Sequence, residues 1–211
     1  VELPLSPQLD LNGPLVLHRA VYNRIVRDFN GGRELPVEVT TYSDAPPGSG
    51  VGSSSAFAVG IIHSLSLLQQ RLLSDIELAN EAINLEQVEL KENVGSQDQI
   101  ACAVGGLNYI TFGGKSDWVH EPLIIGESKK REIEDRTVLI YTGVHRSSSD
   151  VQANFLIDLN KKVKTMIRTV ELARESKEVL TRDLDLDLIG EMLVESWSLK
   201  KAMNSHAIVL E

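Results

Sequence analysis

The sequence predicts an α+β fold in two parts. A stretch with strand-like alternation, a glycine-rich loop and a long apolar run with helical spacing follow one another between residues 35 and 72. Past residue 136 the composition changes, and segments that carry charges of both signs at helical spacing dominate. We therefore expect a first domain over residues 1–135 and a helix-rich second domain over residues 136–211.

The composition is that of an ordinary globular protein. The 211 residues are 42% hydrophobic and 24% charged, and the net charge of −9 argues against a nucleic-acid surface or general binding to anionic membranes. The single cysteine, Cys102, excludes an intrachain disulfide, and no window approaches the roughly 18 apolar residues of a membrane span. We expect a cytoplasmic protein without nucleic-acid or membrane partners. The oligomeric state, a homodimer included, stays open.

The first part of the chain alternates helices and strands. Apolar residues recur at helical spacing over residues 15–29, and alternating β-branched residues predict a strand over residues 35–42. A helix is expected to open at Ser53 or Ser54, because Ser is a good N-cap, and to run to Leu72.

The next predicted helix carries an acidic residue on its buried side. Ser74 and Glu77 form a capping box that opens it. Apolar residues then follow one face at spacings of three and four, and Glu86 lies on that face. A carboxylate on a core-facing stripe needs a partner or a metal ion. Glu86 is therefore a candidate site residue.

The rest of the chain is less strongly patterned. The predicted elements are a short helix over residues 97–103, strands over 107–112 and, more weakly, 118–125, a charged loop over 126–136, a strand over 137–142, a helix over 150–180 and a last helix from about 184 to 203.

The glycine-rich loop is the clearest functional signal. It reads PPGSGVGSSSAF over residues 46–57 and feeds a helix N-terminus, which favours phosphate binding by backbone N–H groups. It is neither a Walker A loop, since it has no Lys, nor a Rossmann loop, since Ser53 stands where the third Gly is needed. A purely structural turn is the alternative. The candidate phosphate-binding residues are Pro47, Gly48, Ser49, Gly50, Val51, Gly52, Ser53, Ser54 and Ser55.

A second candidate segment, GSQDQ at residues 95–99, follows Glu86. A phosphoryl-transfer enzyme needs a phosphate cradle, a carboxylate for Mg²⁺ and a group near the attacking hydroxyl. Ser54 or Ser53 and Glu86 are candidates for the metal, and Asp98 for orienting or deprotonating the hydroxyl. Each residue alone also fits a structural role, and for Asp98 that role is an N-cap.

Taken together, these residues resemble the central motif of the GHMP kinases. The resemblance rests on the glycine-serine string from Pro47 to Ala56 and on the Glu and Asp that follow it. In that family the loop wraps the phosphates of ATP, and the Glu and Asp serve the metal and the substrate hydroxyl. The resemblance implies ATP and Mg²⁺ here, with Ser54 and Glu86 on the metal and Asp98 as the catalytic residue. Glu89 is the alternative to Glu86.

Within the family, four segments resemble the kinases that phosphorylate D-glycero-D-manno-heptose 7-phosphate at its anomeric hydroxyl. They are residues 50–57, 95–99, 105–110 and 141–150. The resemblance implies ATP-dependent transfer that gives the 1,7-bisphosphate. Related kinases acting on fucose or galactose are the alternatives. Arg146 is a candidate for binding the sugar phosphate, and a solvated loop arginine is the equal alternative.

The resemblance also implies a fold and two missing parts. The first domain resembles the ribosomal-protein S5-like domain of GHMP kinases, and the second an incomplete ferredoxin-like part. The family's first motif and its third, glycine-rich motif are not found in these 211 residues. We therefore expect exposed apolar surface and weak or no activity from this chain alone. The alternative to a kinase is a nucleotide- or anion-binding module without turnover.

Overall fold

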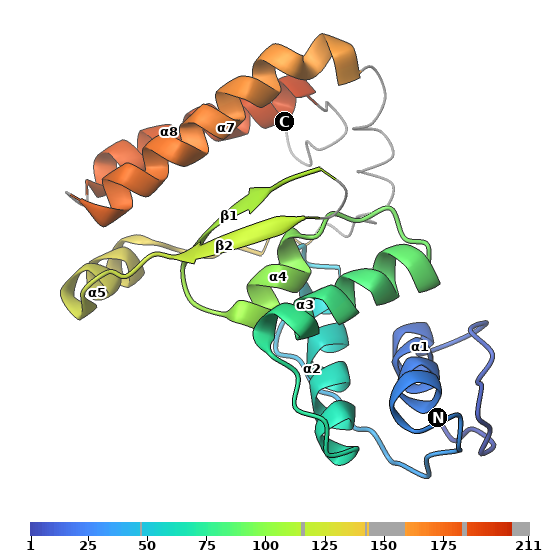
Figure 1. Ribbon diagram of the computed structural model, residues 1–211. Helices are drawn as coiled ribbons and strands as arrows, with labels where there is room; N and C mark the ends of the chain where they lie inside the picture. The colour runs from blue at the N-terminus through green and yellow to red at the C-terminus, as the bar shows by residue number, and fades with distance from the viewer. Residues whose placement is uncertain (47, 115–116, 142, 144–158, 183–184, 204–211) are drawn as a thin grey trace. The chain divides into compact units, whose positions relative to one another are not determined.

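The computed structural model divides into two compact units, Val1–Gly105 and Gly106–Glu211 (Figure 1). The sequence places the boundary later, near Arg136. The difference arises because the segment just after Gly105 contacts later helices, as where the Lys177 ammonium pairs with Glu121 at 2.6 Å. The structure describes residues 1–46, 48–114, 117–141, 143, 159–182 and 185–203.

The first unit is helical, and the helices predicted for it are confirmed. Two of them end in π-turns. The elements are α1 (Val16–Arg24) with the π-turn η1 (Ile25–Phe29), α2 (Ser53–Leu68), α3 (Asp75–Asn84) with the π-turn η2 (Leu85–Glu89), and α4 (Gln97–Val104). α2 stops short of the predicted Leu72 because Gln70 takes a left-handed conformation, with φ of 57°, and the Arg71 N–H turns back to the Ser66 carbonyl.

The predicted capping box at the start of α3 is also confirmed. The Ser74 hydroxyl accepts a hydrogen bond from the Glu77 N–H at 3.3 Å, and the Glu77 carboxylate accepts one from the Ser74 N–H at 2.8 Å. These two bonds satisfy donors that a helix N-terminus otherwise leaves unpaired. They fix where α3 begins and therefore which of its side chains face inward.

The predicted strand over residues 35–42 is wrong. These residues form no strand, and Tyr42 is 85% exposed. A strand needs a neighbour that shares its ladder of hydrogen bonds, and none of the described segments pairs with this one. The segment contacts α1 instead: a nitrogen of the His18 ring lies 2.9 Å from the Thr41 hydroxyl.

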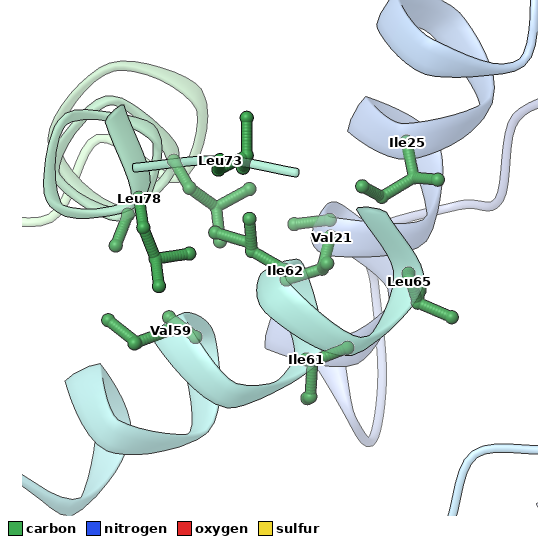
Figure 2. Close-up of a cluster of buried hydrophobic side chains, with 12 residues drawn as sticks. Val21, Ile25, Val59, Ile61, Ile62, Leu65, Leu73 and Leu78 are labelled. Carbon is green, nitrogen blue, oxygen red and sulfur yellow. The ribbon is translucent and has the colours of Figure 1, made fainter. Parts of the chain in front are cut away.

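The core of the first unit lies between α1, α2 and α3, as the close-up in Figure 2 shows. Val21 of α1 and Ile25 of η1 lie against Ile62 of α2, and all three are fully buried. Leu78 brings α3 onto the same cluster. Burying such a side chain contributes roughly 1.5–3 kcal/mol. This packing sets the position of α3 and of the π-turn that continues it.

The second unit begins with a β-hairpin. Strands β1 (Asn108–Phe112) and β2 (Trp118–Pro122) pair antiparallel, with Tyr109 opposite Glu121 and Phe112 opposite Trp118. Both lie where the sequence predicts strands.

Two neighbouring predictions are wrong. Residues 126–136 were expected to form a loop, but α5 (Glu127–Arg136) is a helix, supported by an ion pair between Lys130 and Glu127 at i,i+3 spacing. Of the strand predicted over residues 137–142, the described part, 137–141, is not a strand, and Leu139 is 87% exposed. As with residues 35–42, local strand preference does not make a strand without a partner.

Helices α7 (Leu159–Thr181) and α8 (Leu186–Met203) lie side by side in the second unit (Figure 1). Both are predicted helices, and the Asp-rich start of α8 is capped by Asp185, which accepts hydrogen bonds from two N–H groups of the first turn. The expected exposed apolar surface is present, for example at Leu193 and Val194 of α8. In the described part of the chain, no helix has the length and apolar character that crossing a bilayer requires.

Candidate active site

The glycine-rich loop ends in a helix N-terminus that no side chain caps. Gly48, Gly50 and Gly52 have positive φ angles of 69°, 77° and 72°. The residues between them, Ser49 and Val51, do not have positive φ. Such alternation turns successive N–H groups toward one side and forms an anion-binding nest. Gly52 is the N-cap of α2, so neither Ser53 nor Ser54 caps the helix as predicted. The N–H groups of the first turn are left for a ligand.

Ser49 adds a hydroxyl to this loop. Its N–H bonds to the Pro46 carbonyl at 3.2 Å, which closes a turn at the start of the loop. Its Oγ is buried and has no hydrogen-bond partner among the described residues. An unpaired buried hydroxyl beside an anion-binding nest suits a ligand that brings its own oxygens. Pro47 lies outside the described residues.

Glu86 is a buried carboxylate without a cation beside it. It lies on the π-turn η2 and is 1% exposed, as its place on the apolar stripe predicts. The Ser55 hydroxyl donates to Oε2 of Glu86 at 3.0 Å, and the Gln99 amide donates to the same oxygen. Among the described residues, no Lys, Arg or His forms an ion pair with it. Burying a carboxylate beside neutral donors alone is unfavourable, so the site suits a cation.

The potential around Glu86 is negative. The pKa of the Glu92 carboxyl is raised by burial and, secondly, by the charge of Glu86. The pKa of the Cys102 thiol is likewise raised, first by burial and then by Asp98 and Glu86. Negative potential next to an anion-binding loop favours a divalent cation that links the carboxylate to a phosphate.

Asp98 lies against the glycine-rich loop. A Cβ placed on Gly52 would come within 3.3 Å of Cγ and Oδ2 of Asp98, so a larger residue at position 52 would push the carboxylate away. Asp98 is in the first turn of α4, whereas Ser96 is the N-cap, so the N-cap alternative for Asp98 is wrong. No described residue forms a hydrogen bond with the exposed Asp98 carboxylate, and it is free to meet a ligand at the loop.

A glutamine next to Glu86 holds the segment that leads to Asp98. The Gln87 amide donates to the Val94 carbonyl at 3.0 Å and to the Ser96 hydroxyl at 3.1 Å. The turn before α4 is thereby tied to η2. The structure in this way brings Gly52, Glu86 and Asp98, which are far apart in the sequence, to one junction of α2, α3 and α4.

The other predicted site residues are placed differently. Ser54 is exposed, and the hydroxyl that contacts Glu86 belongs to its neighbour Ser55. Glu89, the alternative metal ligand, forms ion pairs with Arg24 and with Arg27, at 2.8 Å to the latter, so its charge is already paired. Arg146 lies outside the described residues.

The donors present fit a magnesium ion. In the described part of the chain, no three side chains of His, Cys, Asp or Glu gather into an all-protein metal site. Mg²⁺ usually takes one or two carboxylates and completes its shell with substrate phosphates and water. One buried carboxylate, Glu86, beside serine hydroxyls and a phosphate-binding loop matches that donor set.

The sequence does not predict two buried contacts of Glu86. Gln99 belongs to the GSQDQ segment without a predicted role, and Ser55 is predicted to bind phosphate, yet both contact Glu86. A sequence signal for Gln99 exists: it directly precedes Ile100 and stands four residues before Ala103, so it falls on the apolar side of the predicted helix. The structure shows that it is buried there. A polar residue on a buried face needs a polar partner.

The chain is similar to a known protein family and to two characterised enzymes. Residues 16–106 match the GHMP kinases N terminal domain. A D-glycero-alpha-D-manno-heptose 7-phosphate kinase from Campylobacter jejuni is 33% identical over 195 residues, which are 92% of this chain and 57% of that relative. A bifunctional fucokinase/GDP-fucose pyrophosphorylase from Arabidopsis thaliana is 26% identical over 174 residues, 80% of this chain and 16% of that protein.

Solved structures show the same likeness. A D-glycero-D-manno-heptose 1-phosphate kinase from Bacteroides thetaiotaomicron aligns with a TM-score of 0.80 and 30% identity, over 93% of this chain and 58% of its own. A Campylobacter jejuni protein assigned as a sugar kinase aligns with a TM-score of 0.73 and 31% identity, over 93% of this chain and 56% of its own. The chain thus spans little more than half of these proteins. The predicted α+β fold and the predicted resemblance to GHMP kinases are confirmed, and residues 16–106 match the GHMP kinases N terminal domain.

Proposed function

We propose that the protein acts as an ATP-dependent sugar kinase that phosphorylates the anomeric hydroxyl of D-glycero-D-manno-heptose 7-phosphate to give the 1,7-bisphosphate. The observation that carries the proposal is the buried, cation-free carboxylate of Glu86 at the junction with a glycine-rich loop. The names of the similar kinases support the substrate class. The single cysteine is in keeping with a reducing cytoplasm.

The loop and the start of α2 hold the triphosphate in this proposal. Backbone N–H groups between Gly48 and Ser55, other than that of Ser49, donate to phosphate oxygens, and the positive end of the α2 dipole adds to the attraction. Ser54 and Glu86 hold Mg²⁺. When bound, the ion offsets the negative charge on the phosphates and lowers the barrier to their transfer.

Asp98 acts on the acceptor. Its carboxylate lies against Gly52, so it faces the same space as the phosphate-binding N–H groups. From there it orients the anomeric hydroxyl and accepts its proton as the phosphoryl group is transferred. Arg146 is proposed to bind the phosphate of the sugar through paired hydrogen bonds.

The test is a turnover assay on the wild type and Asp98→Asn, with ATP and each of heptose 7-phosphate, heptose 1-phosphate, fucose and galactose. We expect heptose 7-phosphate to give the highest turnover of the four sugars, at the weak level expected of this chain alone. Asp98→Asn should lower kcat by about 10²–10⁴ and leave ATP affinity nearly unchanged, as expected for loss of a general base. Asp75→Asn, an exposed first-turn aspartate of α3, is the matched control and should keep wild-type turnover.

Other outcomes of this assay would contradict the proposal or part of it. Loss of ATP affinity in Asp98→Asn would assign that residue to the metal. ATP binding without turnover of any sugar would support a nucleotide-binding module. Absence of ATP binding, with and without Mg²⁺, would leave the glycine-rich loop a structural turn and would overturn the proposal.

A further inference from the structure

Two buried side chains converge on one oxygen of Glu86. Ser55, from the first turn of α2, and Gln99, from α4, both donate to Oε2. Among the described residues, no hydrogen bond reaches Oε1 of the same carboxylate. The carboxylate is therefore held at one oxygen by two different helices, while its other oxygen is left for a further partner.

The Gln99 amide is oriented by this contact. Turning it over would bring its carbonyl oxygen against the Glu86 carboxylate, and two acceptors repel each other, so the amide nitrogen must be the atom that faces Glu86. The amide oxygen, Oε1 of Gln99, is then buried without a hydrogen-bond partner in the described part of the chain. An unsatisfied buried acceptor lowers stability.

Packing alone does not account for a glutamine at this place. Gln99 is as buried as its neighbour Ile100, and an apolar side chain of similar length would avoid the unpaired oxygen. Groups that cost stability are concentrated at functional sites. The function that the contacts indicate is control of the direction of the Glu86 carboxylate.

We propose that Gln99 and Ser55 are positioning residues, which hold Glu86 by Oε2 so that Oε1 points to the metal ion of the bound nucleotide. The inference rests on the proposed function, because it takes Glu86 as the metal ligand. It also gives α4 two tasks on adjacent residues, since Asp98 faces the glycine-rich loop while Gln99 fixes the metal ligand.

The test is direct metal binding, which does not depend on turnover. Mn²⁺ affinity is measured by electron paramagnetic resonance with the full chain and a non-hydrolysable ATP analogue. Gln99→Met keeps the length and volume of the side chain and removes the donor, and we expect it to weaken Mn²⁺ binding by about 10–100-fold, the usual effect of losing a residue that orients a ligand. Ser55→Ala removes the other donor to the same oxygen, and we expect a weakening in the same direction.

Gln97→Met is the matched control. Gln97 is an exposed glutamine of the same helix, and its replacement should leave Mn²⁺ affinity at the wild-type value. Circular dichroism of each variant without metal establishes that it is folded. A folded variant with weakened Mn²⁺ binding supports a positioning role, whereas loss of folding in both Gln99→Met and Ser55→Ala would show that the pair is structural and would overturn the inference.

Glu86→Gln separates this inference from the proposed function. If Glu86→Gln binds Mn²⁺ as the wild type does, Glu86 is not the metal ligand and the proposed metal site is wrong. If Glu86→Gln loses Mn²⁺ binding but Gln99→Met and Ser55→Ala retain wild-type affinity, only the positioning inference is overturned.

Discussion

The two units of the chain bury their side chains to very different degrees. In the first unit, α1, α2 and α3 enclose a continuous core, and residues such as Ile62 and Leu85 are wholly buried. In the second unit, α7 and α8 keep much of their apolar surface exposed, with Leu193 at 63% and Val194 at 68%. The contacts between α7 and α8 include ion pairs of Arg168 with Glu195 at the surface.

This difference in burial shows which unit can shield a functional polar group from water. The buried polar side chains of the described residues, Ser55, Ser66, Glu86 and Gln99, all belong to the first unit. A carboxylate keeps a strong attraction for a cation only where water is excluded. The closed core of the first unit is therefore what makes Glu86 a credible metal ligand, and comparing the stability of the two units tests that view.

Truncating a core residue should have the largest effect. Ile62→Ala removes a fully buried side chain at the contact of α1 and α2, and we expect a loss of about 2–5 kcal/mol in the free energy of unfolding. Ile167→Ala in α7 removes a side chain that is half exposed, and the loss should be far smaller. Urea unfolding of both variants measures the two values, and equal losses would contradict the contrast between the units.

An arginine in each unit offers a second comparison. Arg24 is mostly buried and pairs with both Glu81 and Glu89. Arg24→Met should therefore cost about 3 kcal/mol, because it removes the partner of Glu81 and leaves Glu89 only Arg27. Arg168 also pairs with several glutamates, but at the surface. They are Glu171, Glu175 and Glu195. Arg168→Met should therefore have a small effect that disappears in high salt. A strong salt dependence for Arg24→Met would argue against its burial.

Neutralising Glu86 should stabilise the metal-free protein, whereas the preceding substitutions destabilise it. Glu86→Gln keeps the shape of the side chain and removes a buried charge without a cation, so the metal-free protein should gain about 1 kcal/mol in unfolding free energy while losing metal affinity. Thermal unfolding without metal measures the gain. A destabilised Glu86→Gln protein would mean that the carboxylate already has a stabilising partner, and the metal hypothesis would lose its main support.

Removing the cap of α3 should have a smaller effect than truncating the core. Ser74→Ala deletes a hydroxyl that accepts a bond from the Glu77 N–H, and the expected loss in unfolding free energy is about 1 kcal/mol. Ser66→Ala, in which a buried hydroxyl without a partner among the described residues is removed, is the contrasting variant and should be neutral or slightly stabilising. The urea midpoint should therefore fall for Ser74→Ala and stay unchanged or rise slightly for Ser66→Ala.

The same capping box predicts a pH dependence. Hydrogen bonds from the Ser74 N–H and hydroxyl hold the pKa of Glu77 below its ordinary value of 4.5. A lowered pKa stabilises the fold above pH 4.5, and this contribution is lost as the pH falls through the folded-state pKa. The difference in stability between the wild type and Glu77→Gln should thus be present at neutral pH and shrink on acidification. A difference that persists in acid would contradict the assignment.

The sequence predicts the features that depend on local pattern. The capping box at Ser74, the helix that follows the glycine-rich loop and the burial of Glu86 on an apolar stripe are all confirmed. The strand predicted over residues 35–42 is wrong, because alternation records local preference, whereas a strand also needs a partner segment that sequence pattern does not provide.

The details of the site depend on contacts that local pattern cannot encode. Whether Ser54 or Ser55 faces Glu86 depends on the residue at which α2 begins, because a shift of one residue turns a side chain about 100° around the helix. The contact of Gln99 with Glu86 joins α4 to η2, and only the tertiary packing brings them together. The sequence therefore identifies the motif residues, and the structure identifies which of them touch.

The position of a bound metal ion is the most direct test of the whole account. Crystals grown with Mn²⁺ and a non-hydrolysable ATP analogue would reveal the ion through its anomalous scattering. We predict a peak beside Oε1 of Glu86, between that carboxylate and the phosphates at the start of α2. A peak beside Glu89, or an ion bound to the nucleotide with no contact to Glu86, would contradict it.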